Sequence, residues 1–211
     1  RELRTLNLTH PQVVLELKYA QKRAEILAQD LIRANTRLRE LTSRDSLTGL
    51  YNSRFFREML RMEIHRAKAY DKLLSLILFD VDHFKDINHT YGHLAGDHAL
   101  QHLSREVRQV IRESDILARF HGHRFAVILP ETGLKGAVVF AERLRRAVED
   151  LELTLHDRTI SLTISLGLTT CSAGFLNKPM DRIIEAATKA LDTAKRNGRN
   201  TFSYTALAEG K

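Results

Sequence analysis

The chain has 211 residues, of which 43% are hydrophobic and 28% are charged, and this composition is ordinary for a globular protein. The length suits one domain with an appendage or two small domains, and no window approaches the roughly 18 apolar residues of a membrane span. The formal net charge is +7, but the basic residues are spread along the chain. This distribution argues against a nucleic-acid-binding protein and favours anionic phosphates as ligands.

Residues 11–43 show one long helical pattern, in which apolar residues recur at alternating spacings of three and four. The seam positions are Leu17, Ala20, Ala24, Leu27, Leu31, Ala34, Leu38 and Leu41. A single helix cannot bury such a stripe alone, so residues 1–43 are predicted to form a parallel coiled coil with a second copy of the chain. The alternative is that the helix packs back on its own domain. The alanines in the seam predict a weak homodimer.

Residues 44–211 alternate between helical and strand patterns. Helices are predicted over 54–70, 95–112, 134–151 and 180–196, and strands over 73–79, 115–119, 125–129 and 159–170. Strand, helix, hairpin, helix and strand in this order predict an α+β fold. Its expected core is ferredoxin-like, a central mixed sheet flanked by helices.

Polar residues follow the first predicted strand directly, in FDVDHFKDINHTYGH. Asp80 stands at the carboxyl end of this strand, where a carboxylate is well placed to hold a divalent cation against phosphates. Taken singly, an aspartate after a strand is usually a cap and a glycine is usually a turn. Together, the density of Asp, Asn, Lys and Gly in this segment favours a binding site.

Four segments resemble, in order and spacing, the motifs of the GGDEF family, the diguanylate cyclases, which condense two GTP into cyclic di-GMP. They are DSLTGLYNSRFF (45–56), FDVDHFKDINHTYGHLAGDHAL (79–100), RFHGHRFAVILP (119–130) and KRNGRN (195–200). The resemblance implies a nucleotidyl-cyclase-like GGDEF fold for residues 44–211, preceded by a coiled-coil signalling helix. It also implies a bacterial signal-transduction protein.

The resemblance assigns roles to six side chains that this chain retains. Asp80 would be a metal ligand, Asn88 and Asp97 would read the guanine edge, and Lys85, Lys195 and Arg199 would hold GTP phosphates. Because the signature hairpin is altered, we expect these residues to form a vestigial or non-catalytic GTP site.

The signature hairpin departs from the family pattern, because the chain reads His121, Gly122, His123, Arg124 and Phe125 where the family has GGDEF. An imidazole at position 121 would intrude where a glycine lets the backbone approach the nucleotide. His123 lacks the hard oxygen donor that magnesium prefers, and Arg124 would repel a metal and is free to pair with Asp80. Phosphoryl transfer depends on positioning and charge neutralisation, so we expect no cyclase activity. No cofactor should be required, and Mg²⁺ would matter only with residual GTP binding.

A second site is indicated by Arg112-Glu113-Ser114-Asp115, which has the spacing to the hairpin of the family's RxxD inhibitory site. The resemblance implies that this site binds cyclic di-GMP, with Arg143 on the next helix as a further ligand. An arginine can make bidentate contacts to guanine or phosphate, and Asp115 can accept from guanine N–H groups. The alternative is a helix-end ion pair without a ligand.

We therefore expect a catalytically inactive GGDEF domain that acts as a cyclic di-GMP receptor and is coupled to a dimeric coiled coil. The alternatives are a dimerisation module with vestigial nucleotide sites, a GTP-binding regulatory domain and, least favoured, a residual cyclase. Five histidines between residues 83 and 102 include His98 and His102, four apart on a helix, but no third ligand at zinc spacing accompanies them. The single cysteine, Cys171, fits a reducing, cytoplasmic location, with any sensor or membrane anchor lying upstream.

Overall fold

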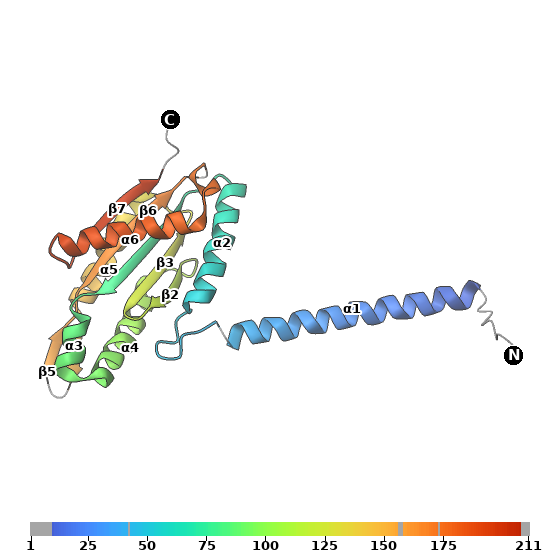
Figure 1. The fold of residues 1–211 in the computed structure, drawn as a ribbon, viewed down its shortest axis with the longest axis horizontal. Coiled ribbons are helices and arrows are strands. Elements are labelled where there is room, and N and C mark those ends of the chain that lie inside the picture. The colour runs from blue at the N-terminus through green and yellow to red at the C-terminus, as the bar shows by residue number, and fades with distance from the viewer. Residues whose placement is uncertain (1–9, 42, 156–157, 173, 208–211) are drawn as a thin grey trace. The chain divides into compact units, whose positions relative to one another are not determined.

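The computed structural model describes residues 10–41, 43–155, 158–172 and 174–207 (Figure 1). The chain divides into two compact units, Arg1–Ser43 and Arg44–Lys211, and each is described by itself.

The first unit contains one helix, α1 (His10–Leu41). Its apolar stripe is exposed, with Leu17 at 64%, Leu27 at 63% and Leu31 at 69% of full exposure. The side chains of Ala34, Leu38 and Leu41 lie outside the described residues. Within the described part of the chain, no helix is both long and apolar enough to cross a membrane. The coiled coil and the homodimer stay predictions, and the exposed stripe is the feature that a partner helix would cover.

The second unit is built on a five-stranded sheet with the order β2-β3-β1-β6-β7. The strands are β1 (Leu74–Val81), β2 (Ile116–His121), β3 (Arg124–Pro130), β6 (Ile164–Cys171) and β7 (Phe202–Leu207). Central strand β1 runs antiparallel to β3 and β6, whereas β6 and β7 are parallel. A separate two-stranded hairpin consists of β4 (Glu152–Leu155) and β5 (Arg158–Ser161).

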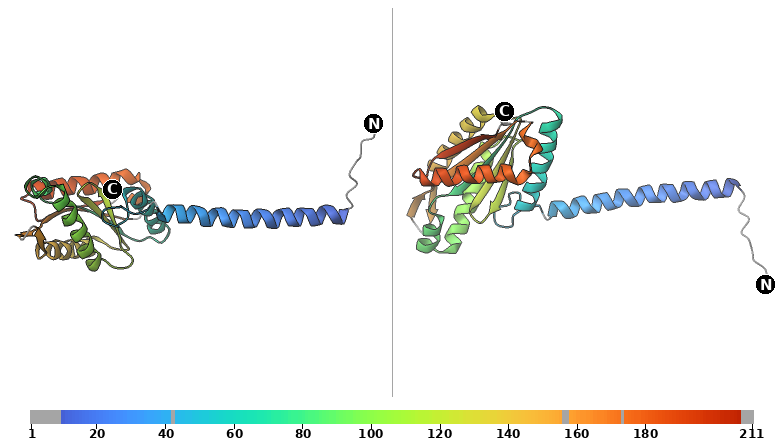
Figure 2. Two further views of the ribbon diagram at one scale, coloured as in Figure 1. Left: turned by 90° about the horizontal axis from the view of Figure 1, so that it is seen from below. Right: turned by 45° about the horizontal axis from the view of Figure 1, so that its top comes forward.

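Helices cover both faces of this sheet (Figure 2), so the predicted mixed sheet flanked by helices is confirmed. One face packs against α2 (Ser53–Ala69) and α6 (Met180–Arg196), which follows the short 3₁₀ helix η1 (Phe175–Asn177). The other face packs against α3 (Phe84–Tyr91), α4 (His93–Val110) and α5 (Leu134–Glu149). All eight residues of β1 are buried, which explains its largely apolar run LSLILF.

Helix α6 lies unusually close to β6 because of Gly167. A side chain at this position would collide with the backbone of Ala187 and Leu191 on α6. Lys195 follows Leu191 by one helical turn, so the close approach carries its side chain to the end of β1.

The structure contains helix α3 and strand β4, which were not among the predicted elements, and it differs from the prediction in two further strands. The predicted strand over 159–170 is divided, because the chain changes partner at Leu162 and Thr163: β5 pairs with β4, and β6 pairs with β1. Strand β7 was not predicted. It is a sheet edge with three exposed residues, which weakens the apolar pattern that sequence reasoning needs.

Candidate functional site

The first candidate site lies where β1 ends. Asp80 is the seventh residue of this buried strand, and the register of the sheet places it opposite Arg124 on β3 and Ser165 on β6. The chain then turns sharply at His83, whose φ of 53° is left-handed, and enters α3. The turn brings α3 beside the signature hairpin, where the rings of Phe84 and His123 stack with centroids 5.1 Å apart.

Three basic side chains converge on the Asp80 carboxylate, which is 3% exposed. Lys195 donates to Oδ2 over 2.5 Å, and Arg124 Nη2 lies 3.5 Å from the same oxygen. His123 Nε2 lies 3.0 Å from Oδ1, in the geometry of an ion pair rather than an aligned hydrogen bond. Burial alone would raise the pKa of Asp80, but the contacts with His123 and Lys195 outweigh it and hold the pKa below its usual value.

The metal that the family resemblance implies does not fit this arrangement. Both oxygens of Asp80 already face basic groups, and Arg124 adds a fixed positive charge beside them. A divalent cation would have to displace Lys195 and then lie near a guanidinium, with a single carboxylate as its hard ligand. Across the described ranges, no group of three His, Cys, Asp or Glu side chains could hold a metal ion, and this includes the histidines between residues 83 and 102.

Asp82, two residues further, has a structural role. Its carboxylate accepts hydrogen bonds from Thr163 Oγ1 at 2.9 Å, Ser165 Oγ at 2.7 Å and the backbone N–H of Asn200 at 3.0 Å. These bonds tie the end of β1 to β6 and to the loop after α6. The KRNGRN motif spans the end of α6 and this loop, so Asp82 helps to position Lys195.

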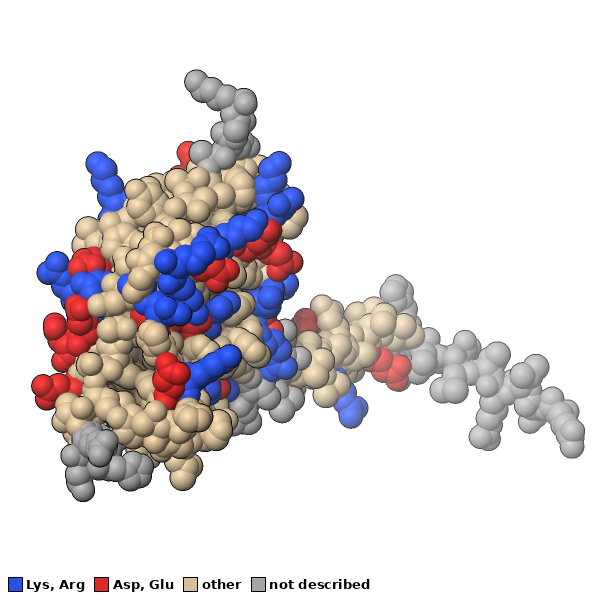
Figure 3. Space-filling model, turned by 60° about the vertical axis from the view of Figure 1, so that its left-hand side comes forward, with Lys and Arg blue, Asp and Glu red and all other residues tan. Residues whose placement is uncertain are grey.

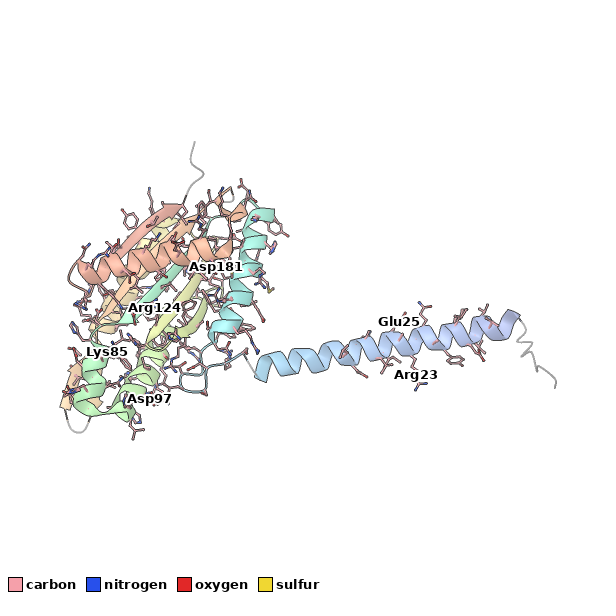
Figure 4. All side chains as sticks on the ribbon, viewed as in Figure 1. Arg23, Glu25, Lys85, Asp97, Arg124 and Asp181 are labelled. Carbon is pink, nitrogen blue, oxygen red and sulfur yellow. The ribbon has the colours of Figure 1, made fainter. Side chains whose placement is uncertain are left out.

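The other predicted nucleotide ligands lie around this centre but do not contact Asp80. Lys85 is exposed on α3, and Asp97 is half-buried on α4. Figure 4 labels both of them and Arg124 of β3. Asn88 places its Oδ1 against Gly96, where a side chain could not fit, and this buried oxygen has no hydrogen-bond partner among the described residues. Arg199 is exposed in the loop after α6.

Arg119 stabilises the hairpin between β2 and β3 through hydrogen bonds, and sequence reasoning did not single out this residue. Its Nε donates to the carbonyl of Gly122 over 2.7 Å, and its Nη1 lies 3.1 Å from Asp45 Oδ1. Asp45 also accepts hydrogen bonds from the backbone N–H and the hydroxyl of Thr48, at 2.9 and 2.7 Å. Asp45 opens the DSLTGLYN motif, so this motif is attached to the hairpin. His121 is exposed at the hairpin turn.

The second candidate site is a cavity of about 320 Å³ that the RxxD motif lines. Asp115 is buried, and its Oδ2 accepts a hydrogen bond from the backbone N–H of Arg112 at 2.9 Å, whereas the side chain of Arg112 is exposed. Arg143 does not line this cavity: its Nη2 donates to the carbonyl of Val110 over 2.9 Å.

Two arginines that the sequence analysis overlooked line the RxxD cavity instead. Arg44 immediately precedes the DSLTGLYN motif, and Arg108 lies near the end of α4, four residues before Arg112. The nearness of Arg108 to Arg112 in the sequence was the available signal for the second of these. On the face shown in Figure 3, basic and acidic side chains are interleaved, so the positive charge does not form a continuous band of the kind that binds nucleic acid.

Comparisons with known proteins match the chain to one family. The family model described as "Diguanylate cyclase, GGDEF domain" matches residues 42–201. Diguanylate cyclase A of Treponema denticola is 35% identical over 79% of this chain and 45% of its own length. Across three curated relatives, the chain spans only 23% to 46% of their length.

Two solved structures also resemble the chain. The diguanylate cyclase SiaD of Pseudomonas aeruginosa, in complex with its activator SiaC, has a TM-score of 0.75 and 31% identity over 94% of this chain and 74% of its own. The coiled coil and GGDEF domain of DgcB from Caulobacter crescentus, in complex with c-di-GMP, has a TM-score of 0.74 and 28% identity over 92% of this chain and 99% of its own. The family prediction is therefore confirmed, and the chain belongs to the diguanylate cyclase GGDEF domain family.

Proposed function

We propose that this GGDEF domain is catalytically inactive and acts as a receptor for cyclic di-GMP through Arg112, Asp115 and Arg143. The observation that carries the proposal is the contrast between the two sites. At the end of β1 the protein's own basic groups surround Asp80, whereas the RxxD motif lines an open cavity.

The loss of catalysis follows from charge. A cyclase must neutralise the negative charge that develops on the transferred phosphoryl group, and the family does this with metal ions. In this chain Arg124 replaces an acidic residue, and Asp80 is occupied by Lys195. Loss of one preorganised charge-stabilising contact typically costs about 10²–10³-fold in rate, and several are lost here at once.

Binding of cyclic di-GMP is supported by the chemistry of the RxxD cavity. Among the described residues, Asp115 Oδ1 accepts one long hydrogen bond, from Ser114 Oγ at 3.5 Å, so it retains capacity to accept from guanine N–H groups. Arg112 is exposed and lines the same cavity. The structures of DgcB named above and of its GGDEF domain alone are both complexes with c-di-GMP, and both resemble this chain at 28% identity. Arg143 is anchored at the end of α4 by Val110 and would have to release this carbonyl to reach the ligand.

The decisive experiment is calorimetric titration of the chain with cyclic di-GMP. Wild type should bind, Arg112→Ala should lose most of the affinity, and Arg61→Ala, an exposed arginine on α2, should bind as wild type does. A parallel turnover assay with GTP and either Mg²⁺ or Mn²⁺ should give no cyclic di-GMP. Absence of binding would reject the receptor, and turnover would reject the inactive enzyme.

A second candidate, non-catalytic binding of GTP, is favoured by Asn88. The amide oxygen of Asn88 is buried against Gly96 and has no partner among the described residues, which is costly; by turning outward it would accept a hydrogen bond from a nucleobase amino group. Titration with a non-hydrolysable GTP analogue tests this candidate, with Asn88→Ala as the variant that should lose binding. A pure dimerisation module remains the third candidate, supported by the exposed stripe of α1, and predicts that neither nucleotide binds.

A further inference from the structure

The RxxD cavity has a second wall, built by the segment that opens the domain. The carbonyl of Gly49 accepts hydrogen bonds from Arg44 Nη1 at 3.3 Å and from Arg108 Nη2 at 2.5 Å. Gly49 has a φ of 66°, a left-handed conformation that other residues adopt only with strain. One glycine carbonyl therefore binds two guanidinium groups, from arginines that lie 5 and 59 residues away from it in the sequence.

The cavity carries an excess of positive charge. Arg44, Arg108 and Arg112 line it together with the carboxylates of Glu113 and Asp115. In the described part of the chain, none of the three arginines forms an ion pair with a carboxylate, and Asp115 is engaged by a backbone N–H. Like charges at close range repel, and an anion between them relieves the repulsion. The cavity is therefore suited to a phosphate-bearing ligand.

Arg44 also provides a flat surface. Its guanidinium carbon lies 3.9 Å from the centroid of the Tyr51 ring, and Tyr51 in turn stacks on Phe55, with centroids 4.4 Å apart. Arg44 is exposed, whereas Tyr51 and Phe55 are both half-buried. The guanidinium plane is thus supported from beneath by fixed aromatic rings and remains accessible to a planar ligand. A nucleobase stacks well on such a plane.

We propose that Arg44 and Arg108 are ligand-binding residues of the RxxD cavity: one purine base of cyclic di-GMP stacks on Arg44, and Arg108 contacts its phosphate. This inference rests on the proposed receptor function and extends it to residues outside the RxxD motif. A cavity of about 320 Å³ is small among pockets for drug-sized ligands, which span roughly 300–1,000 Å³. It therefore receives one nucleotide half of the ligand rather than the whole molecule.

Calorimetric titration with cyclic di-GMP tests the inference in the full chain. Arg44→Ala and Arg108→Ala should each weaken binding about tenfold, the effect of losing one base stack or one charged contact. Arg108→Ala should also make the affinity less sensitive to salt, since it removes a phosphate contact. Arg61→Ala serves as the matched exposed control and should leave the affinity unchanged.

A lysine at position 44 separates stacking from a purely structural role. Lysine can still donate to the Gly49 carbonyl and keeps the charge, but its ammonium group has no planar face. Arg44→Lys should therefore bind nearly as weakly as Arg44→Ala, with an unchanged thermal unfolding midpoint. Full affinity in Arg44→Lys would overturn the stacking role. Wild-type affinity in both alanine variants, with loss only in Arg112→Ala, would overturn this inference and leave the receptor intact, whereas absence of binding by wild type would overturn both.

Discussion

Lys195 on α6 donates a hydrogen bond of 2.5 Å to Asp80 at the end of β1, across a sequence separation of 115 residues. The close packing of α6 on Gly167 and the bonds of Asp82 to the following loop bring the two residues together. The ammonium group thereby neutralises a carboxylate that is almost completely buried, with Arg124 as a second cation at 3.5 Å. The contact places the ammonium group at the position where the family resemblance implies a metal.

Removal of the Asp80 charge should destabilise the domain. Asp80→Asn leaves Lys195 and Arg124 without their carboxylate, and we expect a loss of about 2 kcal/mol in the free energy of unfolding at pH 7, as for other charged hydrogen bonds. Asp181→Asn, which breaks an exposed ion pair with Arg57, should cost less than about 1 kcal/mol. Urea denaturation of the three proteins measures both values.

The same contact should make stability depend on pH. The pKa of Asp80 is lowered in the folded protein from 3.8, so its contribution is present above this value and is lost as the pH falls through the lower folded pKa. The difference between wild type and Asp80→Asn should therefore shrink when denaturation is repeated near pH 3. A difference that stays constant from pH 7 to pH 3 would show that the Asp80 carboxylate is not held in this way.

Restoring acidic residues in the hairpin should restore metal binding. His123→Asp with Arg124→Glu exchanges two basic groups beside Asp80 for carboxylates, which provides the hard oxygen ligands that Mg²⁺ and Mn²⁺ prefer. The double variant should bind Mn²⁺ in calorimetry or electron paramagnetic resonance, whereas wild type should not. Arg146→Glu, which changes charge on the exposed face of α5, is the control for non-specific attraction. Wild-type binding equal to that of the double variant would contradict the proposed absence of a metal.

The ion pair between Arg119 and Asp45 should couple the hairpin to the DSLTGLYN motif. Burial would raise the pKa of Asp45, but hydrogen bonds from Thr48 and Arg119 lower it overall, so its carboxylate is charged at neutral pH. Both side chains are about four-fifths buried, so the pair should contribute more than an exposed one, about 1 kcal/mol. A double-mutant cycle with Arg119→Ala and Asp45→Ala measures this coupling. Additive effects of the two changes would mean that the motif and the hairpin are energetically independent.

The fold was predictable because its signals are local. The largely apolar run of β1 and the amphipathic helices on both faces follow from the sequence pattern, and the polar residues from Asp80 onward identify the functional end of the strand. The pairing of Arg124 with Asp80 was foreseen as an option, because a cation had replaced an acidic residue opposite a carboxylate.

The contacts that define the two sites were harder to predict from the sequence, because they join segments that are distant along the chain. The Gly49 carbonyl brings Arg44 and Arg108 together, and nothing in the spacing of their residue numbers indicates this. Arg143 was assigned from the family resemblance, but the carbonyl of Val110 holds it away from the RxxD cavity. Side-chain direction at the end of a helix depends on such local acceptors, which a motif does not encode.

The exposed stripe of α1 should make the chain associate through residues 11–43. Leu27 and Leu31 are 63% and 69% exposed, and burial of two leucines in a coiled-coil seam stabilises a dimer by roughly 3–6 kcal/mol. Leu27→Asp with Leu31→Asp should therefore convert dimer to monomer in sedimentation equilibrium, whereas Arg23→Asp with Lys22→Asp, outside the seam, should have a smaller effect. Because the seam contains alanines, the wild-type dimer should itself dissociate at low protein concentration. A chain that stays monomeric at all concentrations would remove the coiled coil as the route by which ligand binding is transmitted.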